Sequence, residues 1–194
     1  FPRSICPKAI PRITTVRVPG DERWEYDDLL QLRHKVEDAG LVLEALENVP
    51  LKFYDQVMLG GPARDRQIEN MIYTIRNIAR AGIPIFGYHW MPTLVGRTSL
   101  TTKIRAGARV TAFDLDESNK APLLKDRAYT EDEMWENLEH WIKIIVPVAE
   151  EEEIRIGIHP CDPPVEQLKG IPQLFRSFDA YKRLISIVES PSNC

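Results

Sequence analysis

Short apolar runs of strand length alternate with amphipathic helical segments along most of the chain. The strand-like runs are LVLEALE (41–47), IPIFGYH (83–89) and IRIGIH (154–159), with ITTVRV (13–18) as a weaker fourth. Apolar residues recur at helical spacing within 29–39, 68–79, 134–148 and 178–188. Because parallel strands are joined by helical crossovers, this alternation predicts an α/β fold with a parallel sheet covered by helices.

The ends of the predicted helices carry their own signals. Gly40 and Gly82 follow the first two helices, at the position where a helix C-terminus favours glycine. Thr130 and Glu133 have the spacing of a capping box, and Ser177 suits an N-cap. These boundaries predict about four strand–helix units in one domain spanning residues 1–194, since no linker or composition shift divides the chain.

Composition and charge exclude several classes of function. The hydrophobic content of 43% and charged content of 28% are ordinary for a globular protein, and the net charge of −4 comes with no basic block that would suggest nucleic acid. The longest apolar stretches fall short of the roughly 20 residues that span a membrane. Three widely separated cysteines do not suggest a disulfide framework, so a cytoplasmic location is expected.

The last residues of the three strong strand candidates are Glu47, His89 and His159. Parallel strands run in the same direction, so these side chains should gather at the carboxyl rim of the sheet, where α/β barrels build active sites. Two imidazoles and a carboxylate suit a divalent transition metal. The alternative is structural, because a strand-end glutamate can cap a turn and a single histidine is often an ordinary polar residue.

The segment HPCDPP that follows the third strand is unusually stiff. Pro160, Pro163 and Pro164 fix their own backbone angles and restrict the residues before them. Such a loop would hold His159 and Asp162 with little freedom, as a preorganised site requires. An ordinary rigid turn is the alternative reading.

Other candidates have weaker signals. Arg97 lies in a long connection, 90–129, and could pair with a substrate carboxylate or simply face solvent. Within the same connection, ARVTAFD is compatible with a short extra strand. LGGPAR (59–64) precedes a helix whose N-terminal amides could bind an anion, although the segment lacks a phosphate-loop pattern. His34 and His140 fall within amphipathic helices and are predicted to be surface residues.

At these residues the chain resembles the mannonate dehydratase family of sugar-acid lyases. The matching segments cover most of residues 23–190 in family order and include WEYDDLLQLRHKVEDAGL, ALENVPLKFYDQVMLGG, PIFGYHWMP, ARVTAFD and IRIGIHPCDPP. The resemblance implies a xylose-isomerase-like TIM barrel and a divalent metal, Mn²⁺ or Fe²⁺. It also implies elimination of water from D-mannonate to give 2-keto-3-deoxy-D-gluconate in hexuronate (glucuronate) catabolism.

The resemblance assigns His159 as a metal ligand, because the family motif H-P-D-D-P-P carries one at this position. Glu47, His89, Arg97 and Asp162 are the expected substrate-binding residues. The sequence departs from the family at two nearby places. Cys161 replaces the first aspartate of the motif, and Gly96 replaces an aromatic residue before the Arg-Thr pair.

The length of the chain predicts only part of such a barrel. A complete barrel takes about 250 residues, whereas 194 residues and about four units correspond to an incomplete barrel, its N-terminal part. The family's remaining metal ligands would lie downstream, so the chain alone is expected to be inactive. Two alternatives stay open: a sugar isomerase or epimerase on the same type of barrel, and a catalytically silent fragment. The expected partner is the sugar acid, without nucleic acid or membrane, and a homo-oligomer is compatible with the sequence.

Overall fold

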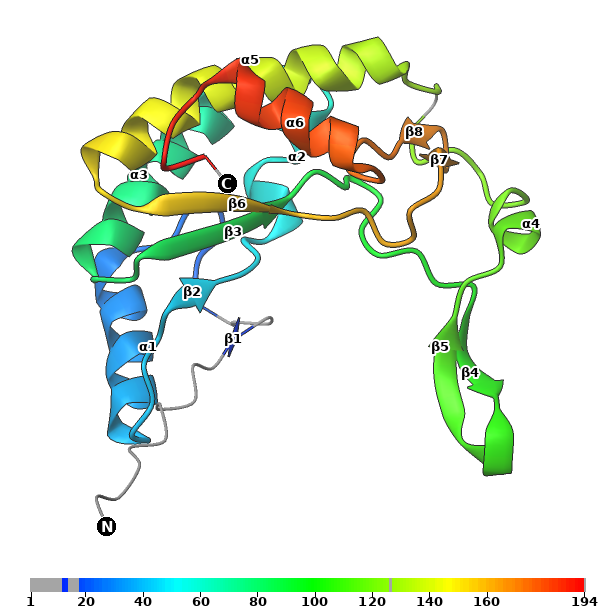
Figure 1. The fold of residues 1–194 in the computed structure, drawn as a ribbon, viewed down its shortest axis with the longest axis horizontal. Coiled ribbons are helices and arrows are strands. Elements are labelled where there is room, and N and C mark those ends of the chain that lie inside the picture. The colour runs from blue at the N-terminus through cyan, green and yellow to red at the C-terminus, as the bar shows by residue number, and fades with distance from the viewer. Residues whose placement is uncertain (1–11, 14–17, 126, 194) are drawn as a thin grey trace.

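The computed structural model describes residues 12–13, 18–125 and 127–193, and its centre is a four-stranded parallel sheet (Figure 1). The strand order is β1 (Arg12–Ile13), β2 (Ala45–Leu46), β3 (Ile85–His89) and β6 (Arg155–His159). The long helices that follow these strands are α1 (Tyr26–Asp38), α3 (Arg64–Arg80), α5 (Glu131–Glu151) and α6 (Phe178–Ile187). The predicted α/β fold with a parallel sheet is therefore confirmed. Of the weak strand prediction at 13–18, residues 14–17 lie outside the described residues.

The strand predicted at 41–47 is much shorter in the structure, where β2 contains only Ala45 and Leu46. The beginning of this apolar run belongs to the end of α1 instead. Gly40 has a φ of +76°, and the Leu41 amide donates to the carbonyl oxygen of Val36 at 3.2 Å. This bond satisfies a helix carbonyl that would otherwise lack a partner, so Leu41 completes the helix cap rather than the sheet.

The predicted helix boundaries are confirmed where a cap was expected. Thr130 and Glu133 form a complete capping box at the start of α5, and the Ser177 hydroxyl accepts a hydrogen bond from the Ala180 amide at the start of α6. Gly82 has a φ of +72° after α3, a conformation that costs glycine less than any other residue. Local sequence therefore determines where these three helices begin or end.

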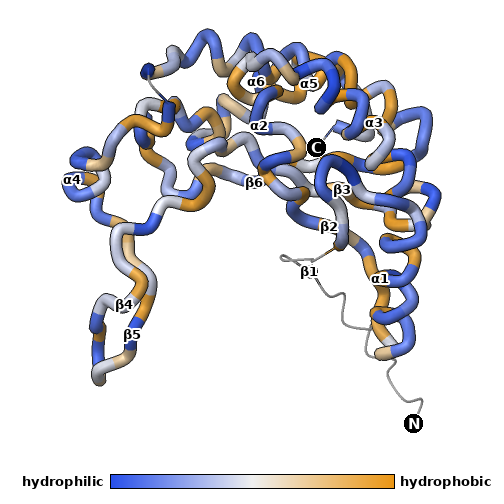
Figure 2. Tube along the Cα trace, turned by 180° about the vertical axis from the view of Figure 1, so that it is seen from behind, coloured by the Kyte–Doolittle hydropathy of each residue, from blue (hydrophilic) through white to orange (hydrophobic). Residues whose placement is uncertain are grey.

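The hydrophobic core lies between the sheet and the helices. Trp141 of α5 packs against Tyr54, Tyr88 and Trp90, with ring centroids about 6 Å apart. All four side chains are almost completely buried, and each such side chain stabilises the fold by roughly 1.5–3 kcal/mol. Figure 2 shows the complementary pattern, with long hydrophilic stretches along α1, α3 and α5.

The long connection between β3 and α5 is ordered into a hairpin rather than an irregular loop. Strands β4 (Ser99–Lys103) and β5 (Arg109–Ala112) pair antiparallel around the 3-10 turn η2 (Arg105–Gly107), and the short helix α4 (Leu115–Ser118) follows. The predicted extra strand in ARVTAFD is β5. In Figure 1 this hairpin projects away from the sheet and helices. Leu100 on β4 is 72% exposed.

Short elements complete the two loops that border the carboxyl rim. The turn η1 (Leu51–Phe53) and helix α2 (Asp55–Met58) follow β2, and the small hairpin of β7 (Gln167–Leu168) and β8 (Ile171–Pro172) follows the proline-rich segment. Among the helices of the described residues, none has the length and apolar character needed to cross a membrane.

Candidate functional site

Glu47, His89 and His159 meet at the carboxyl rim of the sheet, as the strand ends predicted. His89 and His159 are direct partners in the parallel register of β3 and β6. The carboxylate Oε1 of Glu47 lies 3.9 Å from His159 Nε2. Segments far apart in the sequence therefore contribute one imidazole–carboxylate cluster, because all three strands run the same way.

The alternation of side chains along the strands places this cluster on the face of the sheet opposite the core. Phe86, Tyr88, Ile156 and Ile158 are buried, so the intervening residues of β3 and β6 occupy the other face. Gly87 lies on that face beside Glu47. A Cβ at Gly87 would stand 3.1 Å from both Cβ and Cγ of Glu47. The glycine thus gives the Glu47 side chain room to lie over the neighbouring strand.

The surroundings of His159 favour one tautomer of its imidazole. Its Nδ1 lies 2.6 Å from the carbonyl oxygen of Pro160. A carbonyl only accepts hydrogen bonds, so Nδ1 carries the proton and Nε2 keeps a lone pair. The ring is partly exposed, with 36% of the side chain accessible, and its Nε2 is the atom near Glu47. Metal-binding histidines typically donate their second ring nitrogen to a carbonyl or carboxylate in this way.

His89 is held in a different environment. The ring is buried, and its Nδ1 accepts a hydrogen bond from the Met91 amide at 3.3 Å. The Tyr54 hydroxyl donates to the His89 carbonyl oxygen at 3.0 Å and accepts from its amide at 3.3 Å. Burial, followed by the nearby His159, lowers the pKa of His89 to about 4. The imidazole is therefore neutral near pH 7.

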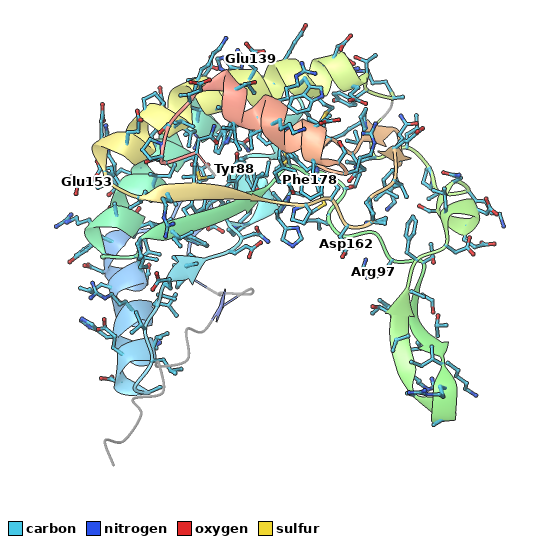
Figure 3. All side chains as sticks on the ribbon, viewed as in Figure 1. Tyr88, Arg97, Glu139, Glu153, Asp162 and Phe178 are labelled. Carbon is cyan, nitrogen blue, oxygen red and sulfur yellow. The ribbon has the colours of Figure 1, made fainter. Side chains whose placement is uncertain are left out.

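Arg97 and Asp162 bind each other beside this cluster (Figure 3). Arg97 Nη2 lies 2.8 Å from Oδ2 and Nη1 lies 3.2 Å from Oδ1, a bidentate pair. The arginine lowers the pKa of the Asp162 carboxyl, and the His159 imidazole lowers it further by a smaller amount. Asp162 is thus within electrostatic range of His159, while its hydrogen-bonding capacity is shared with Arg97.

The two departures from the family pattern have distinct surroundings. A Cβ at Gly96 would stand 3.0 Å from Pro163 Cδ and 3.1 Å from Leu168 Cδ2, so a larger side chain requires its neighbours to move. Cys161 is only 4% exposed and lies at the floor of an open, apolar hollow of about 330 Å³ that Phe175 and Tyr181 also line. Burial raises the pKa of its thiol to about 11. Cys161 is therefore a buried thiol that is almost entirely protonated near pH 7.

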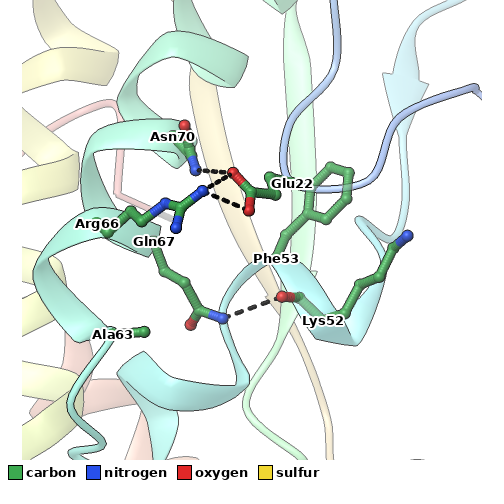
Figure 4. Close-up of a pocket in the computed structure, with 7 residues that line it drawn as sticks. All are labelled: Glu22, Lys52, Phe53, Ala63, Arg66, Gln67 and Asn70. Carbon is green, nitrogen blue, oxygen red and sulfur yellow. Dashed lines mark hydrogen bonds and ion pairs between the residues drawn. The ribbon is translucent and has the colours of Figure 1, made fainter.

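The helix start after LGGPAR, where an anion site was predicted at the backbone amides, is the start of α3. A hollow of about 100 Å³ lies beside the first turns of this helix, and Figure 4 shows the residues that line it. Arg66 Nη2 lies 2.6 and 2.7 Å from the two carboxylate oxygens of Glu22, and Gln67 Nε2 donates to the Lys52 carbonyl oxygen at 3.0 Å. Arg66, a cation in the first turn of α3, is therefore already paired with Glu22, and anion binding by the α3 amides stays a prediction.

The structure also places the two remaining histidines, His34 and His140, and Tyr54, whose role the sequence pattern did not indicate. His34 is exposed, as predicted, but His140 is partly buried, and its Nε2 is shielded from solvent without a hydrogen-bond partner among the described residues. The surface prediction for His140 was wrong because α5 packs against α2, α3 and α6, on more than one side. Tyr54 lies outside the predicted strands and helices, where no periodicity indicates its role.

Within the described part of the chain, no three histidine, cysteine, aspartate or glutamate side chains lie close enough together to hold a metal ion. In this cluster, His159 presents Nε2, with the Glu47 carboxylate 3.9 Å away. A catalytic metal takes about three protein ligands. The arrangement fits part of a metal centre.

The parallel sheet and the polar cluster at its carboxyl rim define an α/β protein of the kind that builds its site from strand ends and the loops after them. The family model for D-mannonate dehydratase (UxuA) matches residues 13–127 and 119–194. The chain belongs to the mannonate dehydratase family.

Curated relatives and a solved structure agree with this assignment. The mannonate dehydratases of Streptococcus uberis and Streptococcus agalactiae are each 33% identical over 200 residues, covering 91% of this chain and 57% of theirs. The crystal structure of mannonate dehydratase from Streptococcus suis serotype 2 matches with a TM-score of 0.74 and 30% identity, covering 90% of this chain and 51% of that one. The chain spans about half the length of these relatives.

Proposed function

We propose that this chain forms part of a metal-dependent hydro-lyase that converts D-mannonate to 2-keto-3-deoxy-D-gluconate and water. Its membership of the mannonate dehydratase family over nearly its whole length carries the proposal. The four parallel strand–helix units would then be the N-terminal part of a (β/α) barrel, with residues 1–194 in one domain. This barrel would act in hexuronate catabolism in the cytoplasm.

His159 would hold a divalent metal, Mn²⁺ or Fe²⁺, through Nε2. The Pro160 carbonyl, 2.6 Å from Nδ1, supports this role because it leaves the Nε2 lone pair available. When bound, the metal would supply Lewis-acid stabilisation of the negative charge that develops on the substrate during proton removal. Glu47, at 3.9 Å from the same nitrogen, would contact the substrate beside the metal.

The other site residues would bind and orient the sugar acid. The guanidinium of Arg97 can hold a carboxylate by two parallel hydrogen bonds, as it holds Asp162. We infer that the substrate carboxylate competes with Asp162 for this group and that Asp162 then contacts a substrate hydroxyl. His89, buried and neutral, would bind a further substrate oxygen.

The isolated chain would be inactive, because its described residues do not complete a metal site. The decisive experiment expresses the full open reading frame containing this chain, loads the protein with Mn²⁺ and measures formation of the 2-keto-3-deoxy acid from D-mannonate. His159→Ala should abolish both turnover and tight Mn²⁺ binding. His34→Ala is the matched control, since His34 is exposed on α1.

Two outcomes would contradict the proposal. A full-length protein that binds Mn²⁺ but leaves D-mannonate unchanged would remove the dehydratase function. A His159→Ala variant that binds Mn²⁺ as tightly as the parent protein would remove the ligand assignment.

A further inference from the structure

The two rim histidines are neighbours in the sheet, yet their hydrogen bonds are opposite in direction. His89 and His159 share one register position on β3 and β6. His159 Nδ1 faces a carbonyl oxygen, whereas His89 Nδ1 faces a backbone amide. An oxygen acceptor requires a protonated nitrogen and an N–H donor requires an unprotonated one. In their neutral forms, the two rings therefore carry their protons on different nitrogens.

The Met91 amide strongly favours one form of His89. Met91 is 2% exposed, and its amide is 3.3 Å from His89 Nδ1. If His89 carried its proton on Nδ1, two donors would face each other in a buried place, and each would lose its partner. An unsatisfied buried donor is costly. The neutral ring accordingly keeps its proton on Nε2.

The Tyr54 hydroxyl fixes the position of the His89 backbone. Strand β2 ends at Leu46, while β3 continues to His89. The Tyr54 hydroxyl bonds to both the amide and the carbonyl oxygen of His89 and so supplies partners at the end of β3. Tyr54 is itself completely buried and stacked on Trp141. The His89 backbone is therefore held in place by a residue of the hydrophobic core.

We propose that His89 is a hydrogen-bond donor to the substrate through Nε2–H and not a ligand of the metal. A metal binds a lone pair, which His159 offers at Nε2 and His89 does not. Within the described part of the chain, His89 Nε2 makes no hydrogen bond, so this donor is available to an oxygen of a bound polyhydroxy acid. The identity of that acid rests on the proposed dehydratase function; the tautomer of His89 does not.

The tautomers can be measured directly in the 194-residue chain labelled with ¹⁵N-histidine. Multiple-bond ¹⁵N–¹H correlation spectra distinguish protonated from unprotonated ring nitrogens, and the chain has only four histidines. His89→Gln and His159→Gln assign the two rim signals by their disappearance. We expect His89 to be protonated on Nε2 and His159 on Nδ1. Protonation of His89 on Nδ1, or a mixture of its two tautomers, would overturn the proposal.

A second experiment tests the donor role in the protein from the full open reading frame. Glutamine at position 89 can place an N–H donor near the original Nε2, whereas leucine cannot. With D-mannonate as substrate, His89→Leu should raise KM by about 10-fold or more, as expected for loss of a buried hydrogen bond. His89→Gln should recover a large part of that loss. Equal effects of the two substitutions would refute the donor role.

A third measurement separates metal binding from substrate binding. The full-length protein is titrated with Mn²⁺ alone, and calorimetry compares the parent with His89→Gln and His159→Gln. We expect His89→Gln to bind within about threefold of the parent and His159→Gln to lose tight binding. A comparable loss in both variants would make His89 a ligand. If the protein fails to turn over D-mannonate, the tautomer and Mn²⁺ results still decide the state of His89.

Discussion

The guanidinium of Arg97 binds the carboxylate of Asp162 through two hydrogen bonds, 2.8 and 3.2 Å long. Arg97 stands at the base of the β4–β5 hairpin, and Asp162 lies in the proline-rich loop three positions after His159. The Gly96 amide also donates to the Asp162 carbonyl oxygen at 3.2 Å. The loops that follow β3 and β6 are thus joined by hydrogen bonds directly beside the cluster of Glu47, His89 and His159.

Arg97→Lys should impair catalysis more than stability. Lysine keeps the charge but cannot form the bidentate pair with a carboxylate. The ion pair is partly exposed, so its loss should change the free energy of unfolding by less than about 1 kcal/mol. In the full-length protein, kcat/KM for D-mannonate should fall at least about 10-fold. Arg109→Lys, on the exposed strand β5, is the control, and unchanged kinetics for Arg97→Lys would assign Arg97 to a structural role.

Tyr54→Phe should destabilise the fold. The substitution leaves the amide and carbonyl oxygen of His89 without their hydroxyl partner in a buried place, at a cost of about 1–3 kcal/mol. Tyr73→Phe is the matched control, because Tyr73 is 40% exposed and its hydroxyl donates to the exposed Glu25. Urea denaturation of both variants should show a change within about 0.5 kcal/mol for Tyr73→Phe. Equal stability of the two variants would contradict the role given to Tyr54.

Acidification should destabilise the metal-free chain through His89. The folded-state pKa is about 4, while an unfolded histidine has a pKa of about 6.5. Between these values the unfolded state binds a proton that the folded state excludes, so the free energy of unfolding falls as pH is lowered through this window. From pH 7 to pH 5 this loss approaches about 2 kcal/mol.

The control for this pH dependence is His89→Asn, which has no ionisable group at that position. Urea denaturation at pH 7 and pH 5 should show a smaller loss for His89→Asn than for the parent chain, by about 1–2 kcal/mol. The same pH dependence in both proteins would mean that His89 does not titrate as its burial predicts.

Cys161 should be protected from alkylation in the folded chain. The thiolate is the reactive form, and burial raises the pKa of this thiol to about 11. Iodoacetamide at pH 8 should therefore modify Cys161 about 100-fold more slowly in the native chain than in urea. Peptide mapping by mass spectrometry separates Cys161 from the other two cysteines. Similar rates in both states would show that the thiol is accessible.

The sequence predicts the sheet and the meeting of His89 with His159 because both depend on local pattern. Strand-length apolar runs separated by helices lead to parallel strands, and parallel strands bring their last residues to one rim. Helix caps such as Thr130 with Glu133 are equally local, since two residues three positions apart carry the whole signal. These features need no knowledge of distant contacts.

The parts that sequence reasoning missed depend on long-range contacts. Arg97 and Asp162 were each expected to bind substrate, but only the folded chain shows that they bind each other across 65 positions. Tyr54 reaches His89 from an irregular turn, so neither helical nor strand periodicity marks it. The tautomers of the histidines likewise follow from which backbone group each ring meets.

The origin of the rim cluster also bears on how such a protein can diversify. Glu47, His89 and His159 each belong to a different strand–helix unit, and each stands where its strand gives way to a loop. Their side chains lie on the face away from the core, so substitution of one of them replaces a single chemical group at the rim and leaves the core side chains of its strand in place. Substitution at the strand ends is therefore a route by which substrate preference can change while the core is kept.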